Sequence, residues 1–157
     1  KDKGIYFFIV GDGVQKEKIR ESIERKNLAN IFLYEKIPSE MVPYALLEAD
    51  AGIAHERNLS MAREMYPAKM FDVMASGKPL LIGIYGVAKN LVEKNKTGIV
   101  FKSDDVNDLV KSILNLASNT LLCIEMGERG KSLVYKEYNR SVQADEYVSL
   151  LKKCIKS

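Results

Sequence analysis

The sequence has few of the residues that build metal sites and disulfide frameworks, with one His, two Cys and no Trp among 157 residues. A structural zinc site uses four Cys or His ligands, so this inventory argues against one, and we expect no metal site. Cys123 and Cys154 both fall at apolar positions of predicted helices. We therefore expect two buried thiols in a reducing compartment rather than a disulfide.

The chain also lacks an excess of either charge and any long apolar run. Its 24 Lys and Arg residues nearly balance its 21 Asp and Glu residues, for a net charge of +3. This balance gives no support for binding to nucleic acid or to a membrane surface. The longest apolar run, from Pro79 to Ala88, is too short to span a bilayer. Because Lys1-Asp-Lys-Gly4 leads straight into a strand pattern, we expect no signal peptide.

What the sequence does contain is an alternation of short apolar runs with helical stretches. The predicted strands are Ile5–Val10, Ile31–Tyr34, Asp50–Ala54, Leu80–Ile84 and Ile99–Phe101. The predicted helices are Lys16–Lys26, Glu40–Glu48 with Ser39 as N-cap, Pro67–Ser76, Gly86 to about Asn95, Asp104–Ala117, about Thr120–Lys136, and Arg140–Lys156. This order predicts an α/β fold, a Rossmann-like doubly wound parallel sheet followed by C-terminal helices, in one domain over residues 1–157. We expect the Met70–Met74 stripe, Tyr44 and Leu47 to lie in its core.

Ligands of doubly wound sheets bind beyond the carboxyl ends of the strands, where the connecting turns of this chain fall. One of these turns is Val10-Gly-Asp-Gly13, which follows a strand and precedes a helix. The dinucleotide fingerprint Gly-x-Gly-x-x-Gly is incomplete there, because its third glycine is missing. Glycines at such a turn also need no ligand, so this motif alone decides nothing.

The segment from Arg63 to Pro79 carries two carboxylates, Glu64 and Asp72, after a polar loop at His55–Glu64. Pro67 suits the first helical position and Gly77 suits the helix end. Between the acids, the helix N-terminus and Lys69 together could hold an anion. Eight residues of helix separate the acids by roughly 12 Å, too wide for a retaining glycosidase pair. Two interpretations stay open: acids that bracket an extended ligand such as a nucleotide-sugar, and solvated surface acids.

Several motifs occur in a definite order: Val10-Gly-Asp-Gly13, Ala49-Asp-Ala-Gly-Ile-Ala54, Glu64-x7-Asp72-x-Met-Ala-x-Gly-Lys-Pro79, and Asn95-Lys-Thr-Gly98 before Ile-Val-Phe. In this order and spacing the chain resembles retaining glycosyltransferase family 4, the glycosyl transferases group 1. The resemblance is to the nucleotide-sugar-binding C-terminal half of its two-domain GT-B fold, and it covers nearly the whole chain.

The resemblance implies that Glu64 is the catalytic residue that meets the hydroxyls of the donor sugar, and that Asp72 contacts the ribose. It implies that the Glu35–Ile37 turn flanks the nucleobase and that the Gly86 loop closes over the donor. Together, the residues and the resemblance predict the donor-binding positions Asp72, Lys69, Met65, Tyr66, Ala68, Lys36, Ile37, Gly11, Gly13, Gly86 and His55. For His55, a loop histidine bonded to its neighbours is the alternative.

The sequence departs from the family pattern in three places. The second acid is usually Glu rather than Asp72, and Pro67 removes one amide, for which Lys69 can compensate. The family's first βα unit, which supplies the central strand and a basic pair for the donor phosphates, is absent before Lys1. We therefore interpret the chain as a fragment of a two-domain enzyme, inactive without its N-terminal half.

The resulting functional prediction is the donor-binding domain of a retaining glycosyltransferase. Its partners are a nucleotide-diphospho-sugar and, through the missing half, a glycan, lipid or polysaccharide-precursor acceptor; no nucleic acid, membrane insertion, metal or cofactor is expected. The expected location is the cytoplasm, or the inner membrane face reached through the missing half. The alternatives are a nucleotide-sugar epimerase and a non-catalytic nucleotide-binding module of the same fold.

Overall fold

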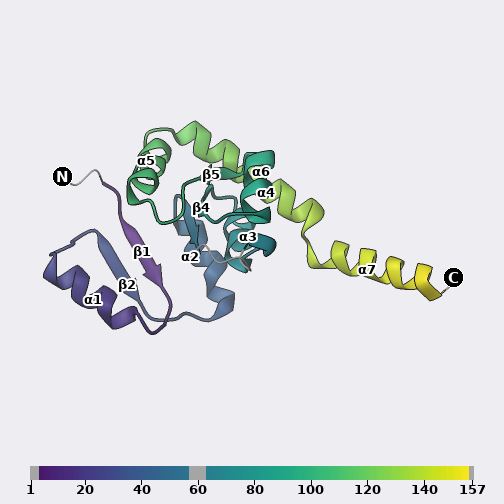
Figure 1. Ribbon diagram of the computed structural model, residues 1–157, viewed down its shortest axis with the longest axis horizontal. Coiled ribbons are helices and arrows are strands. Elements are labelled where there is room, and N and C mark those ends of the chain that lie inside the picture. The colour runs from purple at the N-terminus through teal and green to yellow at the C-terminus, as the bar shows by residue number, and fades with distance from the viewer. Residues whose placement is uncertain (1–3, 57–62, 156–157) are drawn as a thin grey trace. The chain divides into compact units, whose positions relative to one another are not determined.

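The structure, a computed structural model, describes residues 4–56 and 63–155 (Figure 1). The chain divides into two compact units, Lys1–Val42 and Pro43–Ser157. Each unit has its own strands and is described by itself. The prediction that residues 1–157 form one domain stays a prediction.

The first unit consists of a parallel strand pair and one helix: β1 (Phe7–Val10), α1 (Lys16–Arg25) and β2 (Ile31–Tyr34). The apolar run of β1 pairs in register with β2, and the strand begins two residues later than predicted. Stacked aromatic rings line an exposed part of this pair, with the Phe8 and Phe32 centroids 5.3 Å apart. The unit therefore has the local βαβ connection that the alternating pattern indicated.

The next turn differs from the prediction. A 3-10 turn, η1 (Ser39–Met41), precedes α2 (Val42–Glu48). Ser39 is not the N-cap of an α-helix, because it lies inside this turn and its hydroxyl donates to the Glu40 carboxylate instead. The predicted capping role of Ser39 is therefore wrong.

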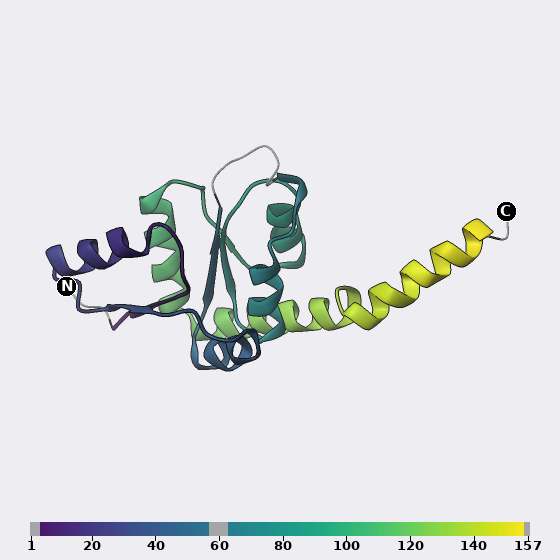
Figure 2. The same cartoon turned by 90° about the horizontal axis from the view of Figure 1, so that it is seen from below.

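The second unit is built on a parallel sheet in the order β3 (Gly52–His55), β4 (Leu80–Gly83) and β5 (Gly98–Val100). The central strand β4 is buried along its whole length, as expected for a strand covered on both faces. Its Leu80 and Ile82 pack in one cluster with helices α3 (Ala68–Ala75) and α4 (Val87–Asn95). Its Leu81 packs in a second cluster with α5 (Val106–Ala117), on the opposite side in Figure 2. Helix α6 (Thr120–Glu137) contributes to both clusters.

The predicted α/β class with parallel sheets is confirmed, but the strands form two sheets rather than one. In the described parts of the chain, no strand pairs with both β1 and β3. Among the described strands, β1 and β2 bond only to each other, and β3, β4 and β5 bond only among themselves, so the expected single sheet is replaced by one sheet in each unit.

Helix α3 begins one residue later than predicted. Pro67 is its N-cap, with extended backbone at ψ 130°, so Pro67 is not the first helical residue. Gly77 ends the helix as predicted, at φ +70°, a conformation that favours glycine. Met70 and Met74 are fully buried, which confirms the predicted core stripe. Helix α6 crosses here so closely that a Cβ on Gly127 would fall 2.0 Å from the Gly77 carbonyl oxygen.

Other predicted core positions are wrong. Tyr44 and Leu47 on α2 are exposed, and it is Leu46 that packs against the core, because α2 turns a different face inward. Helix α7 (Arg140–Ile155) has no buried residue among those described, so Cys154 is exposed. Cys123 is half-buried, with its thiol directed at the Leu116 carbonyl.

Of the helices that the structure describes, none alone is both long and apolar enough to cross a membrane. Helix α5 and the segment Thr120–Ile155, bent by 100° at their junction, pass the same length and composition test only as a pair.

Candidate functional site

The predicted donor-binding residues are distributed over both units. Gly11, Gly13, Lys36 and Ile37 lie in the first unit, and the remaining predicted positions lie in the second. Residues 57–62 of the predicted polar loop lie outside the described residues. The geometry is therefore given separately for each unit.

In the second unit, Lys69 links the start of α3 to the carboxyl end of β3. Its ammonium donates to the backbone carbonyl of His55 at 3.2 Å and lies 3.5 Å from the Glu56 carboxylate. The Lys69 side chain remains 49% exposed. The ammonium therefore lies at the strand end in an ion pair with Glu56, and its exposed side is where an anion can approach.

Glu64 lies in a short turn before α3 and is exposed. Its neighbour Arg63 packs on the turn that opens α4, where a Cβ on Gly86 would fall 2.0 Å from the Arg63 carbonyl oxygen. The Arg63 guanidinium also lies 5.9 Å from the centre of the Tyr85 ring, within cation–π range. The Gly86 turn thus holds the backbone immediately before the predicted catalytic acid.

The other side of this segment is held by aromatic contacts. The Tyr66 ring meets the Phe71 ring edge-on at 5.8 Å and the Tyr138 ring edge-on at 6.0 Å. Burial, followed by the neighbouring Tyr66 phenol, raises the pKa of the Tyr138 hydroxyl above its ordinary value of 10.0. Because the Tyr66 ring packs into this cluster, its side chain anchors the segment. The predicted donor contact of Tyr66 can therefore come from its backbone.

The N-terminus of α3 offers backbone donors. Because Pro67 is the N-cap, the amides of Ala68 and Lys69 open the first turn, where intrahelical acceptors are lacking. The Met70 amide already donates to the Pro67 carbonyl. Asp72 is exposed one turn further on. Amides, ammonium and two exposed carboxylates on one short segment can bind an anion and hydroxyl groups of one ligand.

His55 is the last residue of β3, and its ring is fixed by the end of β5. The ring stacks on Phe101 at 6.1 Å with 9° between the planes. Its Nε2 atom lies 3.3 Å from the Ser103 hydroxyl and 3.6 Å from the Asp104 carboxylate. His55 therefore is bonded to neighbours, as the alternative interpretation held.

Sequence reasoning missed Glu56, Ser103 and Asp104 as members of this cluster. Their positions held a signal, because each lies within three residues of the carboxyl end of a predicted strand, and these ends face the ligand edge of a parallel sheet. The turn that brings Asp104 back toward β3 has φ +64° at that residue, which no apolar pattern indicates.

In the first unit, the Gly11–Gly13 turn leaves room for a ligand. Both glycines have positive φ, 148° and 156°, and a Cβ at either would meet no atom within 4 Å. The Asp12 carboxylate accepts a hydrogen bond from the Gly13 amide at 2.7 Å. An anion that used this amide would therefore have to displace Asp12.

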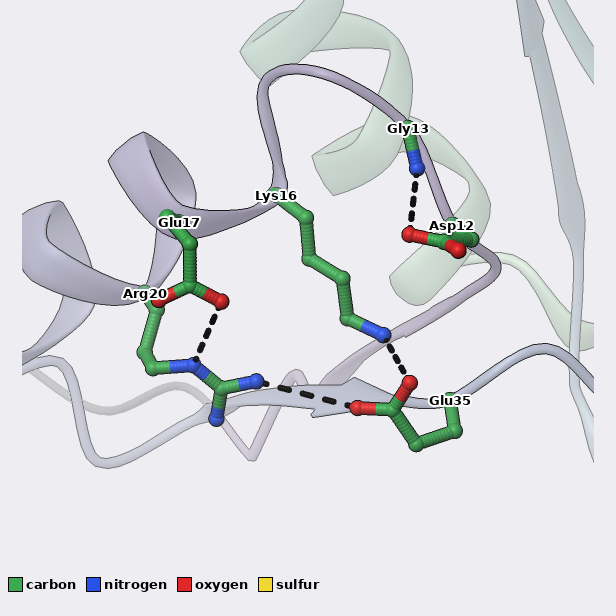
Figure 3. A network of polar contacts seen from close by, with 6 residues as sticks. All are labelled: Asp12, Gly13, Lys16, Glu17, Arg20 and Glu35. Atoms are coloured by element: carbon green, nitrogen blue, oxygen red, sulfur yellow. Dashed lines mark hydrogen bonds and ion pairs between the residues drawn. The ribbon is translucent and has the colours of Figure 1, made fainter.

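A charge network fixes the residue before Lys36 and Ile37 (Figure 3). The Glu35 carboxylate pairs with the Lys16 ammonium and lies 3.8 Å from the Arg20 guanidinium. Lys16 buries its side chain to 10% exposure while its charged end reaches Glu35. Sequence reasoning missed this network, which holds the start of the predicted nucleobase turn.

A metal site needs several His, Cys, Asp or Glu side chains in one place. In the parts of the chain that the structure describes, no group of three or more such side chains is placed to hold a metal ion.

Comparison with known sequences gives a family. A family model described as glycosyl transferases group 1 matches residues 1–133. The chain is 28% identical over 156 residues to the poly(ribitol-phosphate) alpha-N-acetylglucosaminyltransferase of Staphylococcus aureus (strain COL), covering 96% of this chain and 29% of that protein. It is 26% identical over 136 residues to an uncharacterized glycosyltransferase of Methanocaldococcus jannaschii, covering 87% of this chain and 37% of that protein.

Solved structures give the same fold. A TarM mutant from S. aureus, in a complex that includes UDP, matches with a TM-score of 0.78 at 25% identity, over 95% of this chain and 29% of that one. HepE from Anabaena in complex with UDP-glucose matches with a TM-score of 0.82 at 17% identity, over 97% of this chain and 42% of that one. The chain thus spans less than half the length of each of these relatives. From the match over residues 1–133, the chain belongs to the glycosyl transferases group 1, a family of transferases with the GT-B fold.

Proposed function

We propose that the chain binds the nucleotide-diphospho-sugar donor of a retaining glycosyltransferase. The observation that carries the proposal is the segment from Glu64 to Asp72. It places a helix N-terminus and the Lys69 ammonium between two exposed carboxylates, beside the carboxyl end of β3. An amide-and-ammonium site suits a diphosphate, while carboxylates accept hydrogen bonds from sugar hydroxyls.

In this proposal each group has a defined task. The amides at the start of α3 and Lys69 stabilise the charge that develops on the leaving diphosphate. Glu64 accepts hydrogen bonds from the donor sugar, and Asp72 accepts them from the ribose. The bond between the sugar and the diphosphate breaks on the face where the acceptor hydroxyl bonds, and the donor phosphate takes the acceptor proton, which gives retention.

The donor we propose first is a UDP-sugar. Relatives named for N-acetylglucosamine transfer and neighbours described with UDP or UDP-glucose support this choice. Gly11, Gly13, Lys36 and Ile37 stay proposed donor contacts from the first unit. A glycan, lipid or polysaccharide-precursor acceptor bound outside these 157 residues, cytoplasmic location and metal-independent donor binding also stay proposals. The family match favours a transferase over the epimerase alternative.

Substitution of Glu64 tests the proposal in the full-length enzyme. Glu64→Ala should abolish sugar transfer from UDP-N-acetylglucosamine and leave UDP affinity close to wild type, because Glu64 meets the sugar and not the nucleotide. Glu128→Ala, which removes an exposed carboxylate on α6, is the matched control and should keep full activity. A fully active Glu64→Ala enzyme would remove Glu64 from the site.

A further inference from the structure

The ring of His55 is held from several directions by residues of other elements. Phe101 stacks on one side, and Gly83 lies so close that a Cβ there would fall 2.9 Å from the His55 Cδ2 atom. Ser103 and Asp104, in the turn that follows β5, both face Nε2. The His55 side chain is nevertheless 40% exposed, so an ordered ring keeps one part open to solvent.

The hydrogen bonds of Ser103 determine which ring nitrogen carries the proton. The Ser103 side chain is buried, and its hydroxyl donates to the Glu56 carbonyl at 3.2 Å. A hydroxyl has one hydrogen, so toward His55 the Ser103 oxygen can only accept. The Asp104 carboxylate, 3.6 Å from the same nitrogen, is also an acceptor. Both neighbours therefore favour a hydrogen on Nε2.

It follows that the neutral ring keeps Nδ1 as its unprotonated, accepting nitrogen. Within residues 4–56 and 63–155, no hydrogen bond to Nδ1 is present. An accepting nitrogen on an ordered, partly exposed ring suits a ligand hydroxyl better than a phosphate oxygen, because phosphate oxygens do not donate. The residues that impose this state, Ser103 and Asp104, need not touch the ligand themselves.

We propose that Ser103 and Asp104 are positioning residues, which fix His55 with Nδ1 free to accept a hydrogen bond from a hydroxyl of the donor sugar or its ribose. This inference rests on the proposed function for its ligand, but the tautomer of His55 depends only on this chain. The two parts can therefore be tested separately.

The tautomer is read from the ring ¹⁵N resonances of the chain at a pH where the ring is neutral. The chain has a single His, so the two signals are unambiguous. Wild type should hold the hydrogen on Nε2, while Ser103→Ala and Asp104→Asn should each raise the population with the hydrogen on Nδ1. Asp145→Asn, on exposed α7, is the matched control and should change nothing. Unchanged tautomer populations in both variants would overturn the inference.

The ligand is tested with UDP-N-acetylglucosamine by titration calorimetry. His55→Ala and Ser103→Ala should each weaken binding by about threefold to tenfold, the range expected for one hydrogen bond. The double variant should bind no more weakly than His55→Ala alone, since Ser103 acts through His55. Additive losses would overturn the positioning role. A wild-type protein that binds no UDP-sugar would overturn the proposed function, whereas a tautomer indifferent to Ser103 and Asp104 overturns only this inference.

Discussion

Replacement of Gly86 by alanine tests whether the turn before α4 holds the segment that carries Glu64. Gly86 has φ +82° and ψ −141°, a region that residues with a Cβ rarely adopt. Forcing alanine into it costs about 1–3 kcal/mol. The new Cβ would also fall 2.0 Å from the Arg63 carbonyl oxygen, and the displacement it demands costs about 1–3 kcal/mol more.

Gly86→Ala should therefore destabilise the second unit by about 2–6 kcal/mol, which lowers Tm by roughly 4–24 °C at about 2–4 °C per kcal/mol for a chain of this size. Because the clash is with backbone, relief requires the Arg63–Glu64 segment to shift, so affinity for a UDP-sugar should fall as well. Thermal unfolding followed by circular dichroism measures the first effect, and calorimetry at a temperature where the variant is folded measures the second.

The matched control is Gly77→Ala. Gly77 also has positive φ, but a Cβ there meets only the Lys131 Cδ atom at 3.6 Å, an ordinary contact. The Gly77→Ala variant should lose only the conformational part of the stability, about 1 kcal/mol of unfolding free energy, and should keep its affinity for the UDP-sugar. Equal loss of stability in both variants, or full donor affinity in Gly86→Ala, would refute the reasoning about the Arg63 contact.

Three further predictions concern packing and titration. Burial raises the pKa of the Tyr138 hydroxyl, so its contribution to stability is complete below pH 10.0 and is lost as the pH rises through the folded-state pKa. Tyr138→Phe should therefore show a smaller fall in Tm over that alkaline range than wild type. An identical fall in both proteins would contradict the assignment. Iodoacetamide should modify Cys154 before Cys123, because Cys154 is exposed and burial raises the pKa of the Cys123 thiol. Peptide mass spectrometry would detect the order of modification, and the reverse order would contradict the packing. On α6, Gly127→Ala should destabilise by about 1–3 kcal/mol, because its Cβ would fall 2.0 Å from the Gly77 carbonyl oxygen. Gly130→Ala, whose Cβ would lie no closer than 3.1 Å to Met74, should lower denaturant stability less, and equal effects would contradict this.

Local sequence patterns predicted most of the secondary structure. The apolar run of β2 and the helical period of α5 were enough to place these elements within two residues, since burial imposes the period directly. The segment from Glu64 to Gly77 was also recognisable, because Pro67 and Gly77 mark the two ends of a helix by backbone chemistry. The start of that helix was predicted less accurately, because Pro67 is its N-cap and not its first helical residue.

Contacts between distant parts of the chain were not predictable in this way. Ser103 reaches His55 across 48 residues of sequence, and only the parallel register of β3, β4 and β5 brings the two strand ends together. The exposure of Cys154 likewise depends on what packs against α7, which helical periodicity does not report. A period identifies the apolar face of a helix but not the surface that covers it.

The most direct test of the central claim is calorimetric titration of UDP-N-acetylglucosamine into wild type, Asp72→Asn and the control Asp145→Asn. Asp72 is exposed on α3, so its substitution removes a proposed charged acceptor without opening the core. Loss of a hydrogen bond to a charged group costs about 1.5–3 kcal/mol, so binding to Asp72→Asn should weaken by at least tenfold, with the control unchanged. Equal affinity of Asp72→Asn and wild type would contradict the assignment of this segment as the donor site.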